Sequence, residues 1–508
     1  MSNPLPLFAG GTFKHVPAAE VQVSKLASSP VWSANGIPDQ SLSEPLAPPP
    51  NTYHRYHIET RTAPDIVPLP SRFRVKVKKH RLIAMVLKEL FEVKGDLKVA
   101  LSRPCVYGVF SRPVGGLAPR EELCVGCLRC TVQYPGIVQI HPNPLRQRLG
   151  DSFVRPEYVD TILYEARTGR VPVRGAGYRG LFGGEGWDGL WTDMSEIVRP
   201  TRDGIHGREF ISTAVDIGEK PTFLHFDDRG EVVGPVPTMI TTQVPFFFDV
   251  PAYTTSPEPL LQIFTEAARQ VETLAIVPIT SVIQFSLQGQ HVVPLIDPAA
   301  WTWLNQLSWS PRMLVLDGWD QERYDALRHR FPDSIICVRV PMDTNLLELV
   351  QYGPRVFHLT ANYHGYVGDQ FVMDLVLQAH QRLVDAGVRE EITLVGGGGI
   401  VLAEHVPKAI ICGLDAVSLD VALAVALQAR FNGECIDRET ASLSFLRLNT
   451  AWGVQRLKNL AASWQDQLLE ILGAMGLREV RRLRGETGRC MFQKELEREV
   501  FGAEGSGT

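Results

Sequence analysis

Short apolar runs alternate with longer amphipathic stretches between residues 238 and 430. Six runs have the length and composition of buried strands: TLAIVPI, MLVLDG, SIICVRV, RVFHLTA, EITLVGG and DAVSLD. Stretches such as QFVMDLVLQAHQRLVDAG and LAEHVPKAIICG lie between several of them, and their apolar residues recur at helical spacing. Alternating strands and helices predict an α/β fold with a parallel sheet, either closed into a barrel or open.

The pattern changes on both sides of this region. Residues 1–70 hold 12 of the 36 prolines, which predicts an extended arm that wraps a partner subunit, or a partly ordered tail. A basic alternating stretch, RFRVKVKKH, then leads into a helix; it can dock an acidic electron carrier or be an ordinary solvated segment. We divide the chain into an arm (1–70), a small domain (71–150), a connecting segment (151–236), the alternating region (237–450) and a C-terminal helical segment (451–508).

Net charge, hydropathy and the first residues of the chain give expectations about partners, membrane insertion and location. The net charge of -5 gives no reason to expect a nucleic-acid partner. No run of about 18 apolar residues is present, so we expect no membrane span. The first residues, MSNPLPLFAG, lack the charged and apolar regions of a secretory signal, so we expect a cytoplasmic location.

Four of the eight cysteines lie within 26 residues of one another. Cys124, Cys127 and Cys130 have the spacing C-x2-C-x2-C, and Gly126 lets the backbone approach a metal cluster closely. Such clustering in a reducing compartment points to metal or redox chemistry and not to disulfides.

A 4Fe-4S cluster needs a fourth ligand. Two-cluster ferredoxins place a cysteine where this chain has Tyr134, followed by proline, and Pro135 is retained here. Cys105, nineteen positions before Cys124, has the separation expected of the missing ligand. We predict one 4Fe-4S cluster held by Cys105, Cys124, Cys127 and Cys130 in an α+β ferredoxin-like domain. A zinc site, a three-iron cluster without Cys105, and free thiols are the alternatives.

Three stretches carry a resemblance to a known family: VDTILYEARTGRVPVRGAGYRG, LVDAGVREEITLVGGGGIVLAEHVPKAIICGLDAVSLD and WQDQLLEILGAMGLREVRRLRGETGRCMF. They resemble the flavin-binding domain of glutamate synthases, in the stand-alone archaeal-type form with an added ferredoxin module. The similarity covers residues 155–501 with gaps. It implies a (β/α)8 barrel that binds FMN and reduces the imine formed from 2-oxoglutarate and ammonia.

The resemblance assigns roles to residues at the ends of the barrel strands. Gly397, Gly398 and Gly399 follow one strand and precede a helix, where barrels of this type bind phosphate; a tight turn is the alternative. The glycines do not form a dinucleotide motif, so we expect electrons to arrive through the iron–sulfur cluster. Arg339 stands where the family has a lysine that faces the flavin, and a cation there stabilises the reduced ring.

Several loops of the family pattern differ here. The family's M-S-[FY]-G-A-x-S is replaced by VPAYTTS, T-G-E-G-G by VPITS, and K-P-G-x-G-G-x-L-P-G is missing. The G-G-T-G after strand six is replaced by ANYHGYVG, and His364 in this segment is a candidate catalytic residue together with Arg339. We expect these losses to shorten the barrel.

The leading hypothesis is a glutamate-synthase-like oxidoreductase that passes electrons from ferredoxin, or from another electron-transfer subunit, through the cluster to FMN. No cysteine precedes Cys105, so we expect no amidotransferase domain, and ammonia must be free or supplied by a partner. We expect an oligomer or a subunit of a complex. The alternatives are a non-catalytic electron-transfer or scaffold subunit whose barrel has lost flavin, and a reductase of another oxo or imino acid.

Overall fold

The computed structural model describes residues 56–92, 94, 105–112, 115–172, 183–192, 211–221, 223–234, 237–251, 253, 257–440 and 442–502. Most of the proline-rich arm, residues 1–55, lies outside this set. No helix in the described part of the chain is both long and apolar enough to cross a membrane.

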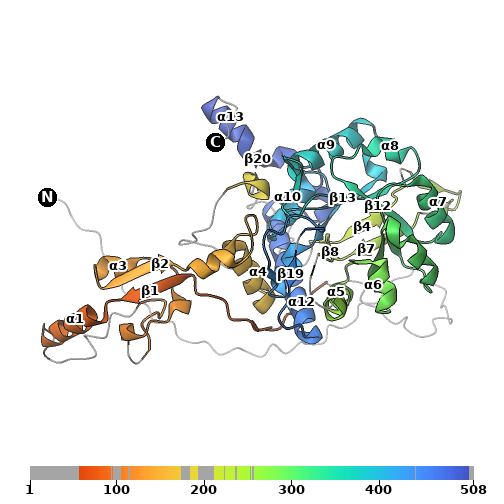
Figure 1. Ribbon diagram of the computed structural model, residues 1–508. Helices are drawn as coiled ribbons and strands as arrows, with labels where there is room; N and C mark the ends of the chain where they lie inside the picture. The colour runs from red at the N-terminus through yellow and green to blue at the C-terminus, as the bar shows by residue number, and fades with distance from the viewer. Residues whose placement is uncertain are drawn as a thin grey trace, which may run out of the picture. The chain divides into compact units, whose positions relative to one another are not determined.

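A closed barrel of parallel strands forms the centre of the fold (Figure 1). In the order of hydrogen bonding the strands are β8 (Phe246–Asp249), β9 (Ala275–Pro278), β10 (Val292–Ile296), β11 (Met313–Asp317), β12 (Ile335–Pro341), β13 (Val356–Thr360), β16 (Thr393–Gly397) and β17 (Ala416–Leu419). β17 pairs with β8 and closes the ring. The prediction of a shortened barrel is therefore wrong as far as the number of strands is concerned. The altered loops connect strands, and all eight strands are present.

The six apolar runs of the sequence correspond to six of these strands, and β8 and β10 are the two that the pattern did not single out. β10 contains Pro294 in its centre, and proline in a central strand normally argues against that assignment because it has no N–H to donate. β8 is buried at all four positions of FFFD. A strand covered on both faces carries no alternation to reveal it.

Helices cover the outside of the barrel. They are α5 (Pro257–Val271), α6 (Ile279–Gln284), α7 (Gln321–Arg330), α8 (Leu346–Val350), α9 (Val372–Asp385), α10 (His405–Ile411) and α11 (Val421–Ala426), with a 3-10 helix, Pro298–Gln306, after β10. The long helix α12 (Thr450–Ala474) packs against α5 and against α4 (Pro156–Thr168). Trp464 of α12 is buried, and its indole N–H donates to the carboxylate of Glu165 of α4 at 2.9 Å. This bond fixes the two helices to each other.

An antiparallel pair, β4 (Val215–Gly218) with β7 (Met239–Thr242), covers the N-terminal end of the barrel. Gly218 accepts a hydrogen bond from Thr393 Oγ1, at the first residue of β16, at 2.7 Å. Nearby, the buried carboxylate of Asp415 accepts from Arg389 at 2.8 Å and Lys220 at 3.0 Å. Burial alone would raise the pKa of Asp415, but the surrounding cations lower it, so this end of the barrel is held by a fully paired charge cluster.

The small domain is built on two antiparallel strands, β1 (Phe73–Val77) and β2 (Val138–Pro142). Helix α1 (Lys79–Glu92) follows β1, and the short α3 (Arg129–Gln133) lies between the cysteines and β2. Val75 and Val138 pack on the buried Cys124, so one face of the strand pair covers the cysteine loop. Helix α1 buries none of its residues.

Shorter elements complete the fold. They are β3 (Leu190–Thr192) paired with β20 (Cys490–Phe492), β5 (His225–Phe226) with β6 (Val232–Val233), β14 (Tyr366–Val367) with β15 (Gln370–Phe371), β18 (Arg430–Phe431) with β19 (Leu443–Ser444), and helix α13 (Gln493–Phe501).

Residues 56–70 form no regular element and follow the chain's own barrel helices. Ala63 N–H donates to Arg167 at 2.9 Å, and Asp65 pairs with the buried Arg456 of α12 at 2.9 Å. These bonds fix the described end of the arm to its own chain.

Candidate functional site

Four cysteines line one small cavity beside β1. Cys105, Cys124, Cys127 and Cys130 share it with apolar side chains that include Val75. Cys124 is buried, Cys105 and Cys130 are half-buried, and Cys127 is exposed. All four predicted ligands therefore lie together, and one of them reaches the surface.

Two residues of the cysteine loop have a left-handed backbone. Gly126 has φ +69°, and a Cβ at this position would lie 2.3 Å from the ring of Phe73, so only glycine fits. Leu128, at the start of α3, also has a left-handed backbone with φ +60°. A non-glycine residue rarely adopts this conformation, and in a loop between cysteines it points to a functional constraint.

The cysteine sulfurs are not gathered as tightly as the ligands of a single metal ion. Among the described residues, no three of the cysteine sulfurs lie within 4.8 Å of one another. A tetrahedral zinc ion with bonds of about 2.3 Å would hold its sulfur ligands about 3.8 Å apart. Ligands of a cubane bind different irons and stand further apart. The described cysteines are therefore not preset as a tetrahedral zinc site.

Two of the four thiols, Cys124 and Cys130, are poor acids by themselves. Burial raises the pKa of Cys124 and of Cys130, and the neighbouring sulfurs raise it further. A hydrogen bond from the Gly126 N–H acts in the opposite direction on Cys124. Thiolate ligation must overcome this cost, and metal charge is the usual means.

At the opposite end of the barrel from the Asp415 cluster, Arg339 of β12 is buried inside the barrel. Its Nη2 donates to Asp249 of β8 at 2.9 Å, and its Nε donates to Nδ1 of His358 at 3.2 Å. Only 5% of Arg339 is exposed. The cation that the resemblance assigns to a flavin is therefore paired inside the protein.

His358 of β13 is held neutral. Because its Nδ1 accepts from Arg339, the proton sits on Nε2, which donates to Ser418 Oγ at 2.9 Å. Burial lowers the pKa of His358 to about 3, and the adjacent Arg339 lowers it as well. A histidine fixed in this way orients its neighbours and cannot serve as a base near neutral pH.

We call the end of the barrel where Arg339, Asp249 and Asp420 lie the barrel mouth. It contains one carboxylate with a lowered pKa and one with a raised pKa. Burial would raise the pKa of Asp249, but Arg339 and Arg438 lower it, and Asp249 stays ionised. Burial raises the pKa of Asp420 to about 7, and Asp249 adds to this effect. Two carboxylates with pKa values pushed apart, one of them near neutrality, form a pattern found in acid–base sites.

Arg438 is the mouth residue most accessible to a ligand. It comes from the segment after β18 and donates to Asp249 Oδ1 at 3.1 Å, yet 39% of its side chain is exposed. Two arginines therefore flank one ionised aspartate. Asp317 and Asp420 lie near the same arginines, so these carboxylates offset the second positive charge.

Sequence reasoning missed Asp249, His358, Ser418 and Arg438. The first three are single polar residues inside otherwise apolar strand runs, FFFDV, VFHLT and AVSLD. A polar residue in a strand buried on both faces needs a partner, and this signal could have found them. Arg438 lies between the short strands β18 and β19, 19 residues after the last barrel strand, and only the fold brings it to the mouth.

The glycine loop packs tightly against the loop that follows β13. Gly398 has φ +122°, and a Cβ there would lie 3.0 Å from Ala361; Gly399 has φ +68°. The N–H of Gly399 donates to Tyr363 at 3.2 Å. No acceptor for the N–H of Gly398 lies among the described residues. Gly397 ends β16, where the Ser418 hydroxyl fills the space of a Cβ.

His364 links three loops. Its Nε2 lies 3.0 Å from Asp151 Oδ2, and its ring stacks on Phe153 at 5.2 Å. Asp151 also accepts from the N–H of Cys435 at 3.0 Å. Burial would raise the pKa of Asp151, but the bonds from His364 and the backbone lower it. His364 thus lies beside the glycine loop, and its imidazole is hydrogen-bonded to Asp151.

A second cluster of polar side chains lies against the glycine loop. The buried His405 lies with Nε2 3.2 Å from Asp188 and Nδ1 3.2 Å from the carbonyl of Gly399. Trp187 donates to Gly398 O at 3.2 Å. Hydrogen bonds from His405 and Tyr158 help lower the pKa of Asp188 to about 2, against the effect of burial. This group fixes the carbonyls of the loop.

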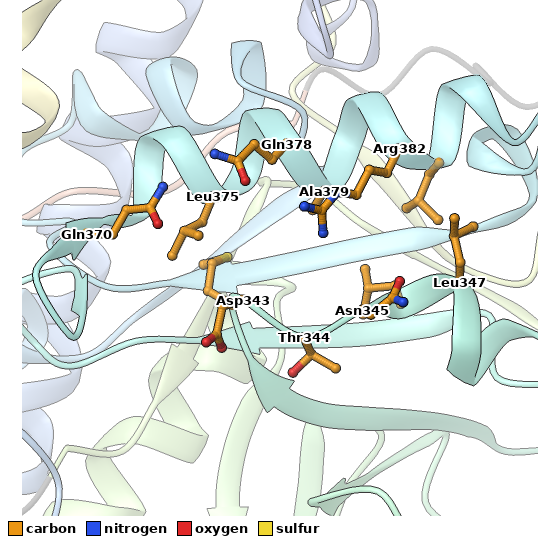
Figure 2. Close-up of a pocket in the computed structure, with 12 residues that line it drawn as sticks. Asp343, Thr344, Asn345, Leu347, Gln370, Leu375, Gln378, Ala379 and Arg382 are labelled. Carbon is orange, nitrogen blue, oxygen red and sulfur yellow. The ribbon is translucent and has the colours of Figure 1, made fainter.

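A separate cavity of about 200 Å³ lies outside these sites. Figure 2 shows it between helix α9, which contributes Gln378 and Arg382, and the loop after β12, which contributes Asp343 and Thr344. None of the predicted site residues lines it.

The chain matches no protein-family model. An archaeal-type glutamate synthase [NADPH] from Dehalococcoides mccartyi is 24% identical over 439 residues, covering 72% of this chain and 86% of that protein. An archaeal glutamate synthase [NADPH] from Methanocaldococcus jannaschii is 36% identical over 139 residues. The chain is a relative of the archaeal-type glutamate synthases.

The stronger identities are local. The match to the Methanocaldococcus jannaschii protein covers 25% of this chain and 27% of that protein. An archaeal-type glutamate synthase [NADPH] from Thermotoga maritima is 34% identical over 192 residues, which is 37% of its length.

Solved structures show weaker likeness. A monotopic membrane protein, (S)-mandelate dehydrogenase, has a TM-score of 0.40 and 10% identity, covering 68% of this chain and 96% of that one. A mandelate oxidase mutant with benzaldehyde has a TM-score of 0.35 and 13% identity, covering 58% and 98%. Values this low do not bear on function.

Proposed function

We propose that the chain is an oxidoreductase subunit that takes electrons through one 4Fe-4S cluster to FMN, for the reductive amination of 2-oxoglutarate or a related oxo acid. One observation carries the proposal: four cysteines line a single cavity in a chain related to archaeal-type glutamate synthases. Cys105, Cys124, Cys127 and Cys130 would be the ligands.

The barrel mouth supports an anionic ligand. The Gly398 amide is a free donor within the described residues, and the glycine loop lies after the seventh strand, where barrels bind phosphate. Arg438 offers a half-exposed cation near the strand ends. FMN would supply hydride transfer when bound, while Arg438 and Arg339 favour negative charge beside it.

The reaction would need two electrons and two protons for each imine reduced to an amine. Asp420 has a pKa of about 7 and is therefore partly protonated near neutral pH, so it would be a proton donor at the mouth. Ammonia would be free or come from a partner. The relatives' names carry NADPH, whereas the glycine loop here is not a dinucleotide motif, so we propose ferredoxin or another electron-transfer subunit as the donor.

An absorption spectrum of anaerobically purified protein tests the proposal. We expect a broad iron–sulfur band together with flavin bands that are released by denaturation. Glutamate should then form from 2-oxoglutarate and ammonia with reduced ferredoxin, and more slowly with NADPH. Flavin without glutamate formation would direct the search to another oxo or imino acid.

A non-catalytic electron-transfer or scaffold subunit is the second candidate. The pairing of Arg339 with Asp249 favours it, because this charge is compensated without any cofactor. The replaced and missing loops of the family pattern favour it too. An iron–sulfur spectrum with no releasable flavin would support this function and reject the first.

A further inference from the structure

The cysteine domain differs sharply in charge from the rest of the chain. Residues 71–150 contain 15 Lys and Arg against 5 Asp and Glu, while all other residues contain 36 against 51. A basic domain on an acidic chain produces a strong local field. That field would attract an acidic partner to the domain that holds the cysteines.

Exposed aliphatic residues that lie within two positions of a cysteine in the sequence form what we call the apolar rim. It consists of aliphatic side chains from the same loops as the cysteines, with exposed fractions of 81% for Val106, 36% for Val125, 45% for Leu128 and 78% for Val132. Val125 also lines the cavity of the four cysteines. Apolar side chains that gather into a contiguous surface patch mark an interaction site.

One cation lies within the rim. Arg129, between Leu128 and Cys130, is exposed, and no carboxylate among the described residues pairs with it. An apolar centre with a basic surround is the common design of protein interfaces that are steered by charge. The rim side chains are aliphatic, but Tyr107, which is 49% exposed and lines the cysteine cavity, offers a ring on which a base could stack.

We propose that the apolar rim, formed by Val106, Val125, Leu128 and Val132 with Arg129, is the docking surface for an acidic one-electron carrier protein. This rests on the proposed function, since the carrier would lose one electron and the cluster beneath Cys127 would gain it. Binding of the carrier would cover Cys127, which is exposed in the free chain. Opposite charges would speed the association of the two proteins, and the aliphatic side chains would pack against the carrier in the complex.

Binding of an acidic ferredoxin to the full-length, iron-loaded protein tests the proposal by calorimetry. We expect saturable binding that weakens from about 0.01 M to about 0.15 M salt. Val132→Asp and Arg129→Glu should each weaken binding about tenfold. Val232→Asp and Arg382→Glu are matched controls at exposed positions outside the domain, and they should bind like the parent protein.

Iron content separates the two proposals. If the parent protein and the rim variants carry the same iron and the rim variants still bind ferredoxin normally, the docking surface is wrong and the proposed function survives. If the parent protein carries no iron after anaerobic preparation, the proposed function itself fails. Competition by a short RNA at equal affinity would also overturn the docking proposal.

Discussion

The cysteine cavity and the barrel mouth both gather reactive side chains, but they balance them differently. In the cavity, four thiols face one another, and burial raises the pKa of Cys124 and Cys130. In the mouth, Arg339, Asp249 and His358 satisfy one another through hydrogen bonds. A donor set left uncompensated by the protein calls for a cofactor, whereas a network that closes on itself is stable without one.

Removal of one cysteine should have the largest effect. Cys127→Ser is expected to abolish the intact 4Fe-4S cluster, because sulfur ligation is lost, while the barrel stays folded. Iron content and the anaerobic absorption spectrum measure this. Cys337→Ser is the matched control, since Cys337 is buried in β12 away from the cavity. If Cys105→Ser retained a complete four-iron cluster, Cys105 would not be the fourth ligand.

Asp249→Asn should destabilise the barrel by about 3 kcal/mol, because it leaves Arg339 buried without its counter-charge. Urea unfolding followed by tryptophan fluorescence measures the change. Asp385→Asn, at an exposed position on α9, is the control. An effect below about 0.5 kcal/mol would mean that the mouth network does not hold the barrel together.

Asp420 predicts a pH dependence of opposite sign to that of most acids. Its pKa is about 7 in the folded chain against 3.8 in the unfolded chain, so the unfolded state releases its proton first as pH rises. Stability should therefore fall from about pH 4 to about pH 7 and then level off. Asp420→Asn should stabilise the protein by about 2 kcal/mol at pH 8 and much less at pH 4. Equal effects at both pH values would show that Asp420 titrates normally.

Gly398→Ala should have the smallest effect, about 1–2 kcal/mol, because its φ of +122° disfavours a side chain and Ala361 lies close. Gly368→Ala, with φ +58° and open space around it, should cost about 1 kcal/mol and separates backbone strain from contact. FMN content in both variants distinguishes a phosphate loop from a simple turn. Only a phosphate loop would lose flavin in Gly398→Ala beyond the loss of stability.

Much of the fold could be predicted from the chain alone. The runs at β9, β11, β12, β13, β16 and β17 and the helices α9, α10 and α12 follow directly from apolar periodicity. β10 was missed because of Pro294, and β8 because a strand buried throughout has no alternation. The closure of the sheet is a long-range property, and the pairing of β17 with β8 joins segments about 170 residues apart.

The sequence by itself determined the grouping of the cysteines, because three cysteines at C-x2-C-x2-C spacing are already local neighbours in the chain. It also determined that a glycine loop follows a strand. Only the tertiary structure decided that Arg339 is paired with Asp249, since these residues lie 90 positions apart and meet inside a closed barrel. The physical reason is that ligand spacing is set by a few backbone dihedrals, whereas charge compensation depends on every strand that reaches the same interior.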